Sequence, residues 1–432
     1  MFSSRMGFES VVTTTPLVGN QYITTFVTGG VDNGTPSSTG YAYVGINGTL
    51  GIGQIDSNGN VIFQNTSNVG YPTYNTLCVD SSGNILVGGL DDSAGSMPGL
   101  IKYSSNGSIL WQKGFSNTTP SLQVNSITTD NTNNVFVLYG YFPGSYIPTT
   151  IAKYNGANGA LINQRALLKS STTTVTGLYF DSTNSTIVVT GTDYANSSSA
   201  IYNGIYDLTN TSNASIVLTQ TSNTTPGYST LTGNNKLCSD STNLYQIATR
   251  VVSGITYYVY MAINKSSGSI LYSNTLTYSS TILTLTGISV DNSGYIYVTG
   301  YSNALMVFAK INASTGSLVW QKSLVSTASG AYNNVSGTIY WMNNFVYVSG
   351  SYTTPSPVTV HTYTCKLKDD GSTSNGTYGT YTLSTVSGTT TARNSFATST
   401  TTDSPSTTSY ATNTPTIGLV TSTYTTTTTT IP

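Results

Sequence analysis

Short runs of alternating apolar and polar residues recur along most of the chain and predict β-strands rather than helices. The clearest run, residues 286–302, places Ile and Val before an Asn-Ser-Gly turn and Tyr, Ile and Val after it, and a second hairpin pattern follows at 308–324. The same pair of patterns recurs at 75–91 with 100–115. Further copies lie at 125–141 with 151–167, 176–192 with 205–220, and 235–250 with 260–276, and two degenerate copies at 21–30 with 51–66 and 336–352 with 362–372.

A glycine at the end of the second strand marks the period of this repeat. It occurs at Gly29, Gly88, Gly140, Gly191, Gly300 and Gly350, with Ala248 in the fifth copy, so that successive units lie 50 to 59 residues apart. A period of this length made of strands is typical of radial β architectures. We therefore predict an all-β protein: a seven-bladed β-propeller of four-stranded antiparallel blades. The alternative, a parallel β-solenoid, usually has much shorter coils and lacks hairpin turns.

The repeat limits divide the chain into three parts. Residues 1–20 form a short polar N-terminal arm, residues 21–387 the propeller, and residues 388–432 an extended Thr-rich C-terminal tail. The first unit is expected to begin with its own first strand at 21–30 and the last unit to end with its own fourth strand at 362–372. On this interpretation no strand is exchanged where the ring closes.

Composition narrows the classes of function. Of 432 residues, 38% are hydrophobic and 7% are charged, with a net charge of −1, while Ser and Thr supply about a third. A surface of hydroxyls and amides suits sugars or other copies of a coat, whereas scattered basic residues argue against nucleic acid. The N-terminus resembles no secretory signal, and no stretch approaches the length of a membrane span. Three distant cysteines, Cys78, Cys238 and Cys365, are expected to be buried rather than disulfide-bonded.

Two motifs carry a resemblance to a known family. Residues 80–89 read D-x-x-G-N-I-x-V-x-G, and residues 102–111 read K-x-x-x-x-G-x-x-x-W. These segments resemble the seven-bladed propeller repeats called SBBP repeats and, more loosely, propellers of quinone-dependent (PQQ) enzymes, over about residues 20–385. The resemblance implies the fold. It brings no cofactor, because the acidic metal ligands of the quinone enzymes have no counterpart set here. The Thr-rich, charge-poor style also resembles structural proteins of phages and archaeal viruses.

Repeated charged residues have two interpretations. An Asp closes the first strand at Asp80, Asp130, Asp181, Asp240 and Asp291. It either lines a metal ring or, as we favour, accepts backbone N–H bonds in the next turn. Lys102, Lys153, Lys310 and Lys366 occupy matching places and form either a cationic spot at one opening or, as we favour, snorkelling or Asp-paired side chains at a repeated structural position.

The remaining candidates give no catalytic, cofactor-binding or metal site. Trp111, Trp320 and Trp341 stack on sugars or, as we favour, pack in the core. His361 is the single histidine, too few for a His-rich metal site. The acidic pairs Asp91–Asp92 and Asp369–Asp370 lack the full spacing of a calcium loop.

The tail carries a different period. Larger side chains recur every seven residues at Phe396, Tyr410, Ile417, Tyr424 and Ile431, with Asp403 interrupting the series. β-branched Thr favours extended chain. The tail is expected either to pair with copies of itself or a neighbouring coat protein by strand addition, or to serve as a flexible linker. In the first case these five residues are the expected assembly contacts.

Together these features predict a non-catalytic virion structural protein, displayed on a capsid or tail and contacting the host surface. Its expected partners are other virion or surface-layer proteins, bound through the C-terminal tail, and a host-surface glycan, with many copies in one assembly. The alternatives are an extracellular or cell-surface adhesin or filament component that binds glycans, and a polysaccharide-active enzyme. No nucleic acid, membrane span or cofactor is expected.

Overall fold

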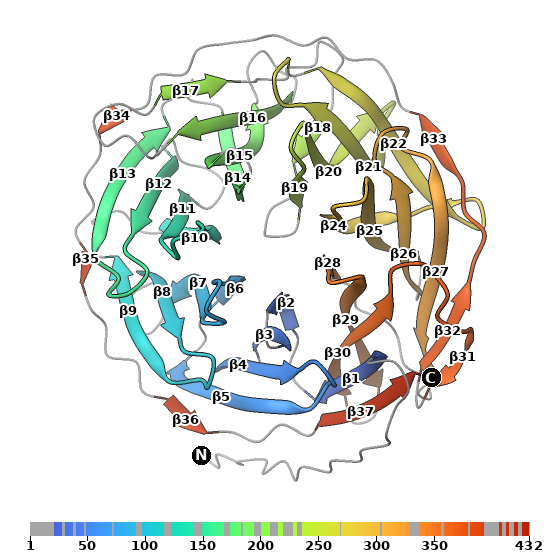
Figure 1. Ribbon diagram of the computed structural model, residues 1–432, viewed down its shortest axis with the longest axis horizontal. Coiled ribbons are helices and arrows are strands. Elements are labelled where there is room, and N and C mark those ends of the chain that lie inside the picture. Colours follow the sequence, from blue (N-terminus) through green and yellow to red (C-terminus); the bar gives the residue numbers. More distant parts are fainter. Residues whose placement is uncertain are drawn as a thin grey trace.

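The computed structural model describes the strands of the chain and their connecting turns. All of its described elements are strands. They form seven antiparallel sheets, which we number 1 to 7 in chain order and which surround a common centre (Figure 1). The described residues are 21–27, 31–37, 40–46, 49–70, 73–91, 97–115, 122–141, 149–167, 173–182, 185–193, 200–207, 215–218, 228–230, 236–267, 269–302, 305–327, 337–355, 358–378, 381–392, 406–407, 412–413, 419–421 and 426–431.

Each sheet is a meander whose strands follow one another from the centre outward. Sheets 1 and 2 comprise β2 (Val31–Ser37), β3 (Gly40–Ile46), β4 (Thr49–Asp56), β5 (Val61–Gly70), then β6 (Thr73–Val79), β7 (Ile85–Asp91), β8 (Met97–Tyr103) and β9 (Ile109–Phe115). Sheets 3 and 4 comprise β10 (Leu122–Thr129), β11 (Val135–Tyr141), β12 (Thr149–Tyr154), β13 (Leu161–Leu167), then β14 (Thr173–Asp181), β15 (Thr186–Asp193), β16 (Ala200–Asp207) and β17 (Ser215–Leu218).

The later sheets receive extra strands. Sheet 5 contains β18 (Tyr228–Thr230), β19 (Leu237–Ser239), β20 (Asn243–Val252), β21 (Ile255–Asn264), β22 (Ile270–Tyr278) and β23 (Thr281–Ile282). Sheet 6 contains β24 (Thr284–Val290), β25 (Tyr295–Ser302), β26 (Leu305–Asn312), β27 (Leu318–Ser326), β32 (Tyr381–Thr385) and β31 (Gly376–Tyr378). Sheet 7 contains β28 (Thr338–Met342), β29 (Phe345–Pro355), β30 (Val358–Lys368) and β1 (Gln21–Val27).

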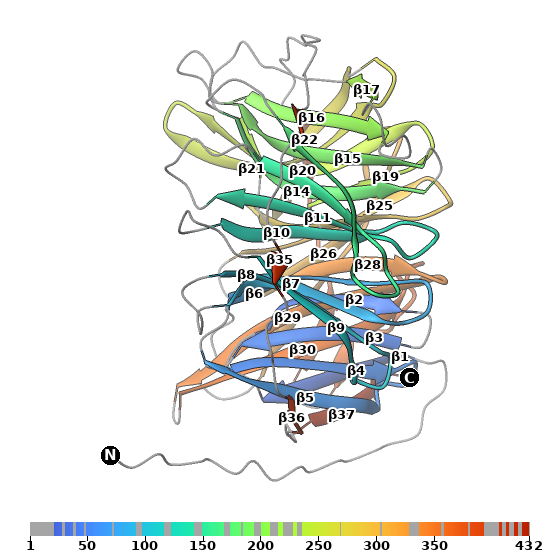
Figure 2. The same ribbon diagram turned by 90° about the vertical axis from the view of Figure 1, so that its left-hand side faces the viewer.

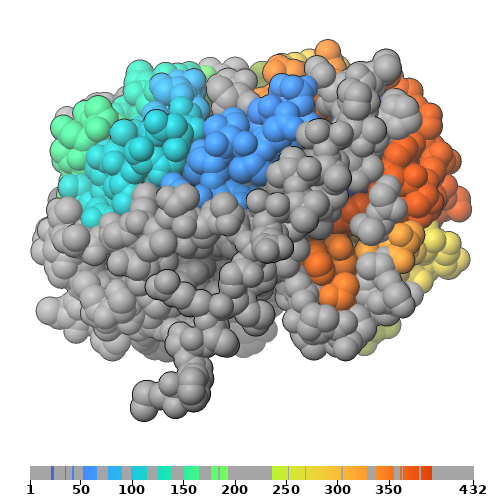
Figure 3. Space-filling view, turned by 90° about the horizontal axis from the view of Figure 1, so that it is seen from below, coloured from blue at the N-terminus to red at the C-terminus, as the bar shows by residue number. Residues whose placement is uncertain are grey.

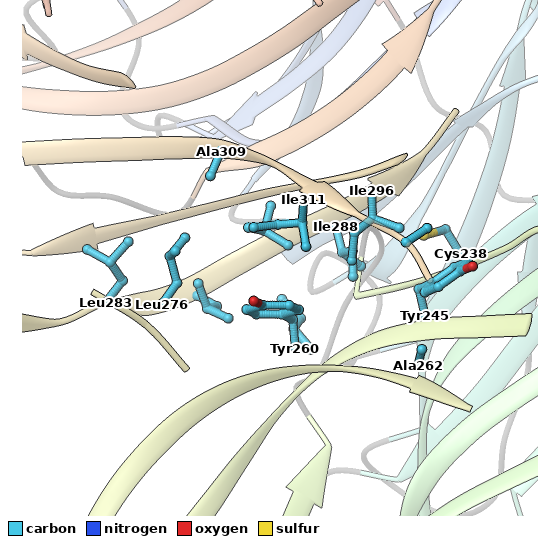
Figure 4. Packing of buried hydrophobic residues seen from close by; sticks show 14 of the residues in the cluster. Cys238, Tyr245, Tyr260, Ala262, Leu276, Leu283, Ile288, Ile296, Ala309 and Ile311 are labelled. Carbon is cyan, nitrogen blue, oxygen red and sulfur yellow. The ribbon is translucent and has the colours of Figure 1, made fainter. Parts of the chain in front are cut away.

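The hydrophobic core is divided among the gaps between neighbouring sheets. Each of the seven clusters of buried hydrophobic residues in the described part of the chain spans two adjacent sheets. Figure 4 shows the cluster between sheets 5 and 6, where Tyr245 and Tyr260 face Ile288, Ile296 and Ile311. Since both faces of a strand pack against a neighbour, one sheet cannot be stable alone, and the sheets stabilise one another as a ring.

The closure of the ring corrects one expectation. We predicted that residues 21–30 open the first unit and that no strand is exchanged. Instead β1 is the fourth strand of sheet 7, where Tyr22 faces Lys366 and Ile23 faces Cys365 on β30. Tyr22 and Ile23 are fully buried there. The alternation of 21–27 predicts a strand but does not specify which edge it joins, and the free outer edge of β30 requires a partner. Gly29, assigned to the repeat series, lies outside the described residues.

The C-terminal segment, residues 388–432, follows the outside of the ring. Its described strands are β33 (Thr390–Ala392), β34 (Ser406–Thr407), β35 (Thr412–Asn413), β36 (Leu419–Thr421) and β37 (Thr426–Ile431). They pair in that order with β22, β13, β9, β5 and β1, the outer strands of sheets 5, 3, 2, 1 and 7. They therefore lie on the perimeter in Figure 1 and against the outer wall in Figure 2. Within the described residues, strand addition occurs on the chain's own sheets.

Candidate functional site

The repeated aspartates shape turns. Asp80 Oδ1 accepts the backbone N–H groups of Ser82 and Asn84, each at 2.9 Å. Asp130, Asp240 and Asp291 accept the equivalent bonds in their own turns, so the structural interpretation is confirmed for these four. Asp181 differs, because its Oδ2 lies 2.5 Å from Lys265 Nζ of the next sheet. Among the described residues, no group of three His, Cys, Asp or Glu side chains is placed to hold a metal ion.

Hydrogen bonding shifts the titration of these carboxyls. Burial alone would raise the pKa of Asp80, but donation from Lys102 and Asn84 outweighs it and the pKa is lowered. At Asp130 burial is outweighed by donors in the turn, and at Asp240 by the Tyr245 hydroxyl together with Asn243 and Thr242, so both pKa values are lowered. These carboxylates therefore stabilise the fold while ionised.

We expect the protein to lose stability as the pH falls below about 4, the ordinary pKa of an unfolded Asp. These carboxyls have a lower pKa in the folded state than in the unfolded state. Their ionised form therefore stabilises the fold at a pH above the unfolded pKa, and this stabilisation is lost as the folded carboxylates take up protons. Urea-unfolding midpoints at pH 7, 5 and 3 measure this loss. An Asp240→Asn variant should show a shallower decline between pH 5 and 3, and an unchanged decline would contradict the assignment.

The matching lysines are tied to neighbouring groups, not gathered at an opening. Lys102 Nζ lies 2.7 Å from Asp80 Oδ2 with both side chains buried, and Lys153 Nζ lies 3.3 Å from Asp130 Oδ2. Lys310 and Lys366 donate to the carbonyls of Asp369 and Ser57 in the following sheet, at 3.2 Å and 3.0 Å. The structural interpretation is confirmed. Lys265, which the repeat pattern did not indicate, is also buried and pairs with Asp181.

A recurrent bond joins successive sheets and explains two of the tryptophans. Trp111 Nε1 donates to the carbonyl of Gly156 at 3.0 Å, and Trp320 Nε1 to that of Asp369 at 3.1 Å. Each indole thus packs on the third turn of the next sheet. A glycine with positive φ, such as Gly159 (φ 67°), is needed there because a Cβ would lie 2.9 Å from the Trp111 ring. The core interpretation of Trp111 and Trp320 is confirmed.

The other single candidates also have local partners. The His361 ring stacks on Tyr352 at 4.6 Å between centroids, and burial lowers the pKa of His361. Of the acidic pairs, Asp369 accepts the Trp341 Nε1 bond at 2.7 Å and Asp370 accepts the backbone N–H of Ser372 at 2.8 Å. Asp92 lies outside the described residues. The three cysteines are free, as expected, and Cys238 and Cys365 are buried, whereas Cys78 is only half-buried.

The best candidate for a binding site is a pocket on the axis of the ring, about 310 Å³ in volume. Each of the seven sheets contributes residues of its innermost region, close to the Asp turns. None of the described lining side chains carries a formal charge. The lining residues are Thr35, Leu77, Cys78, Val79, Ile127, Thr128, Thr129, Leu178, Tyr179, Leu237, Cys238, Ile288, Ser289, Val290, Tyr340 and Trp341.

The chemistry of this pocket suits binding of a neutral molecule. Burial raises the pKa of the Cys78 and Cys238 thiols, which disfavours the thiolate needed for attack or metal ligation. Burial also raises the pKa of Tyr179 to about 12. Trp341 is held in place by Asp369 and by the Ser289 hydroxyl, which accepts its backbone N–H at 2.9 Å. An aromatic ring beside hydroxyl groups fits an uncharged ligand such as a sugar. The sequence motifs did not indicate this pocket, because its lining comes from seven separated segments.

The predicted assembly contacts are only partly described. Phe396, Tyr410, Ile417 and Tyr424 lie outside the described residues. Ile431 is the last residue of β37 and faces Gln21 of β1. The N-terminal arm, residues 1–20, also lies outside them, and within the described ranges no helix is long and apolar enough to span a membrane.

Comparison with known proteins defines the class. Residues 272–305, from β22 into β26, match the family described as Beta-propeller repeat (SBBP). Polysaccharide lyase Uly1 shares 8% identity over 78% of this chain and 89% of its own, with a TM-score of 0.51. The Dos1 propeller shares 10% identity over 79% and 93%, and the β-propeller domain of the Trilobed protease from Pyrococcus furiosus 9% over 80% and 99%, both with a TM-score of 0.45. No relative was found among the curated proteins.

The chain is therefore a β-propeller protein, built of antiparallel sheets and carrying a recognisable propeller repeat. At identities this low, the similarity to the lyase shows the fold alone.

Proposed function

We propose that this chain is a seven-bladed propeller that serves as a non-catalytic structural protein of a virion, displayed on a capsid or tail where it meets the host surface. The seven sheets are the seven blades of this proposal. Within the described residues the C-terminal segment pairs with the outer strands of the chain's own sheets, so the perimeter that it completes is the surface that would meet neighbouring components of the particle. The proposal rests on the character of the exterior.

The observation that carries it is an almost uncharged surface. Among the described residues whose exposure the structure gives, the exposed charged side chains are Lys368 and Asp370. The other charged residues whose exposure is given are buried or half-buried, and ion pairs involve six of them: Lys102 with Asp80, Lys153 with Asp130, and Lys265 with Asp181. A surface of hydroxyls and amides packs against identical neighbours without like-charge repulsion or the desolvation of charges, which is what a dense coat requires.

Localisation of the chain in its native source tests the proposal. We expect the protein to co-purify with particles at a fixed copy number by quantitative mass spectrometry. Cryo-electron microscopy of those particles should show a ring-shaped density on the capsid or tail. Recovery of the chain mainly from the cell surface or the medium, away from any particle, would overturn the virion assignment. Cleavage of a polysaccharide by the purified chain would overturn the proposal that the protein is non-catalytic.

The axial pocket favours a second function, that of an extracellular or cell-surface adhesin that binds glycans. Trp341, Tyr179 and Tyr340 line this uncharged pocket together with Thr and Ser hydroxyls. Glycan-array binding by the isolated chain distinguishes the two functions, with Trp341→Ala as the variant that should lose the signal. Binding without any association with particles would favour the adhesin.

Deleting residues 388–432 should leave a folded propeller that no longer assembles. Sheets 1, 2 and 3 keep four strands each without the C-terminal segment. Their outer edges would then expose unpaired backbone groups, which favour edge-to-edge association of the wrong kind. Far-UV circular dichroism should report retained strand structure, and the variant should be missing from purified particles. Normal incorporation of the truncated chain would refute a docking role for this segment.

A further inference from the structure

Five outer strands carry a β-bulge at the same position. On β9, Ile109 faces Tyr103 and Trp111 faces Lys102, which leaves Leu110 as the extra residue. The same irregularity occurs on β5, β13, β22 and β27. The five extra residues, which we call the bulge residues, are Ile62, Leu110, Ile162, Leu271 and Val319.

All five bulge residues are aliphatic and exposed. Their exposed fractions are 44%, 50%, 45%, 49% and 50% in chain order. Single exposed aliphatic residues are common on protein surfaces. Here, however, the same structural position is aliphatic in five sheets of a chain that is about one-third Ser and Thr. Bulges re-aim a side chain, and these place one apolar side chain per sheet on the rim, where Figure 3 shows sheets 1, 2 and 3 side by side in blue, cyan and green.

The C-terminal segment pairs with the same outer strands immediately beyond the bulges. Asn413 faces Gly114 on β9, Thr421 faces Asn65 on β5, and Thr407 faces Arg165 on β13. All these pairings are antiparallel, so each further residue of the segment advances one residue toward the bulge. The register of the described strands therefore specifies which residues of the segment come next.

Sheet 7 is the last sheet with which the C-terminal segment pairs, through β37 on β1. On β1, Tyr22 faces Lys366 just as Trp111 faces Lys102 on β9. Gln21 directly precedes Tyr22, as a bulge residue directly precedes the equivalent of Trp111 in the other sheets, and its partner across the strand pair is Ile431. Gln21 itself is buried and β1 carries no bulge, so the correspondence is one of backbone position alone. A large residue of the seven-residue series is therefore aligned with this position in the one sheet where the structure describes both.

The period of the segment also matches the ring. Its strands on sheets 3, 2, 1 and 7 begin at Ser406, Thr412, Leu419 and Thr426, six or seven residues apart. Seven extended residues span roughly 23 Å. One heptad therefore advances the segment by one sheet.

We propose that the bulge residues of sheets 1, 2 and 3 are a docking surface for the large side chains of the chain's own C-terminal segment. Continuing the observed registers by three or four residues pairs Tyr410 with Ile162, Ile417 with Leu110, and Tyr424 with Ile62. This pairing accounts for Tyr410, Ile417 and Tyr424 of the seven-residue series, which composition alone left unexplained. Each contact removes apolar surface of both partners from water, which is favourable.

The same construction supplies internal controls. On sheet 6 the described chain does not reach the bulge residue, because the pairing of β32 with β27 ends at Thr385 and Lys322, and Gly388 lies against Gln321 and Thr277. On sheet 5 the register of β33, continued by three residues, would place Ser395 opposite Leu271. Neither sheet thus offers a large apolar partner, so Leu271 and Val319 are outside the docking surface. The proposal does not depend on the virion assignment, because it concerns contacts within one chain.

Disulfide trapping in the full-length chain tests the register. Directly opposed side chains of an antiparallel pair are close enough to cross-link after local adjustment. The pairs Leu110→Cys with Ile417→Cys and Ile62→Cys with Tyr424→Cys should oxidise at least about ten times faster than the shifted pair Leu110→Cys with Thr416→Cys, because a shift of one residue turns the side chain to the other face. Phe115→Cys with Thr412→Cys, a described facing pair, is the positive control.

Mass spectrometry of the non-reduced, digested protein identifies each link. Matched pairs that link no faster than the shifted pair would overturn the proposal. Failure of the positive control as well would show that the segment does not follow this edge, which overturns it equally. Of the native thiols, Cys238 and Cys365 are buried, and the half-buried Cys78 is replaced by Ser in every variant so that it forms no competing link.

A substitution experiment adds a readout without engineered cysteines. Ile417→Ser should increase the rate of limited proteolysis within residues 406–431 several-fold, and Leu110→Ser should do the same. The double variant should be no faster than either single variant, because both remove the same contact. Leu271→Ser should leave the rate unchanged. Equal effects of Leu271→Ser and Leu110→Ser would contradict the proposal.

Discussion

A chain that begins at residue 28, without β1, is expected to form no closed ring. β1 lies between β30 and β37, with six facing residue pairs on each side. It also contributes Tyr22 and Ile23, both fully buried, to the contacts of sheet 7 with its two neighbours. Loss of a buried aromatic or Ile side chain costs about 2–5 kcal/mol. Two such losses approach the whole stability of a domain, about 5–15 kcal/mol.

Thermal unfolding followed by circular dichroism measures this effect. The truncated chain should show no cooperative transition and should elute as aggregate in size-exclusion chromatography. The matched control begins at residue 21 and keeps β1, so it should unfold like the full chain. A cooperative transition at the full-length temperature in the chain that begins at residue 28 would mean that β1 does not close the ring.

This closing strand illustrates what the sequence alone could predict. The seven-unit period and the role of Asp80 follow from residues close together in sequence, since turns and alternating strands are local structures. The partner of β1 is about 340 residues away, at His361 to Lys366. Outer strands with a similar alternation of apolar and polar residues can each pair with β1 as far as local sequence is concerned. The tertiary structure therefore decides which of them β1 joins.

The C-terminal segment shows a second limit of sequence reasoning. Its extended character and its readiness for strand addition follow from its Thr content. The choice between another chain and its own sheets depends on the reach of the segment around the ring. The described pairs Thr412 with Phe115 and Leu419 with Ser67 show strand addition within the chain. The bulge residues also escaped prediction, because an exposed Leu in a strand has no distinctive sequence pattern until the register of its neighbour is known.

Replacing Lys102 by Met should destabilise the protein by about 3–5 kcal/mol, because it leaves a buried carboxylate without its cation. Lys102 Nζ lies 2.7 Å from Asp80 Oδ2, and the two side chains are 3% and 0% exposed. The Gly156 carbonyl, which also accepts a bond from Lys102 at 2.7 Å, keeps its bond from Trp111 Nε1. The loss therefore falls mainly on Asp80. Chemical unfolding at pH 7 measures it.

Two comparisons separate the charge effect from lost packing. Lys153→Met breaks the equivalent pair, which is longer and more exposed at 15% and 11%, and should cost clearly less. The double variant Lys102→Met with Asp80→Asn should recover part of the loss, since no buried charge is then left unpaired. A double variant no more stable than Lys102→Met would assign the loss to packing.

The pH dependence of the stability of the Lys102→Met variant gives an independent check that charge, rather than shape, causes the loss of stability. In the native protein the donors from Lys102 and Asn84 outweigh burial and keep the pKa of Asp80 low. Without Lys102, one of these donors is lost while burial remains, so the pKa of Asp80 moves upward and the variant binds a proton in the folded state more readily than the native protein does. The native protein loses the stabilisation from ionised Asp80 as the pH falls below about 4, whereas the variant has less of it to lose. The stability gap between the two should therefore narrow toward pH 3. A gap of constant size from pH 7 to pH 3 would mean that the Lys102–Asp80 pair contributes through shape rather than charge.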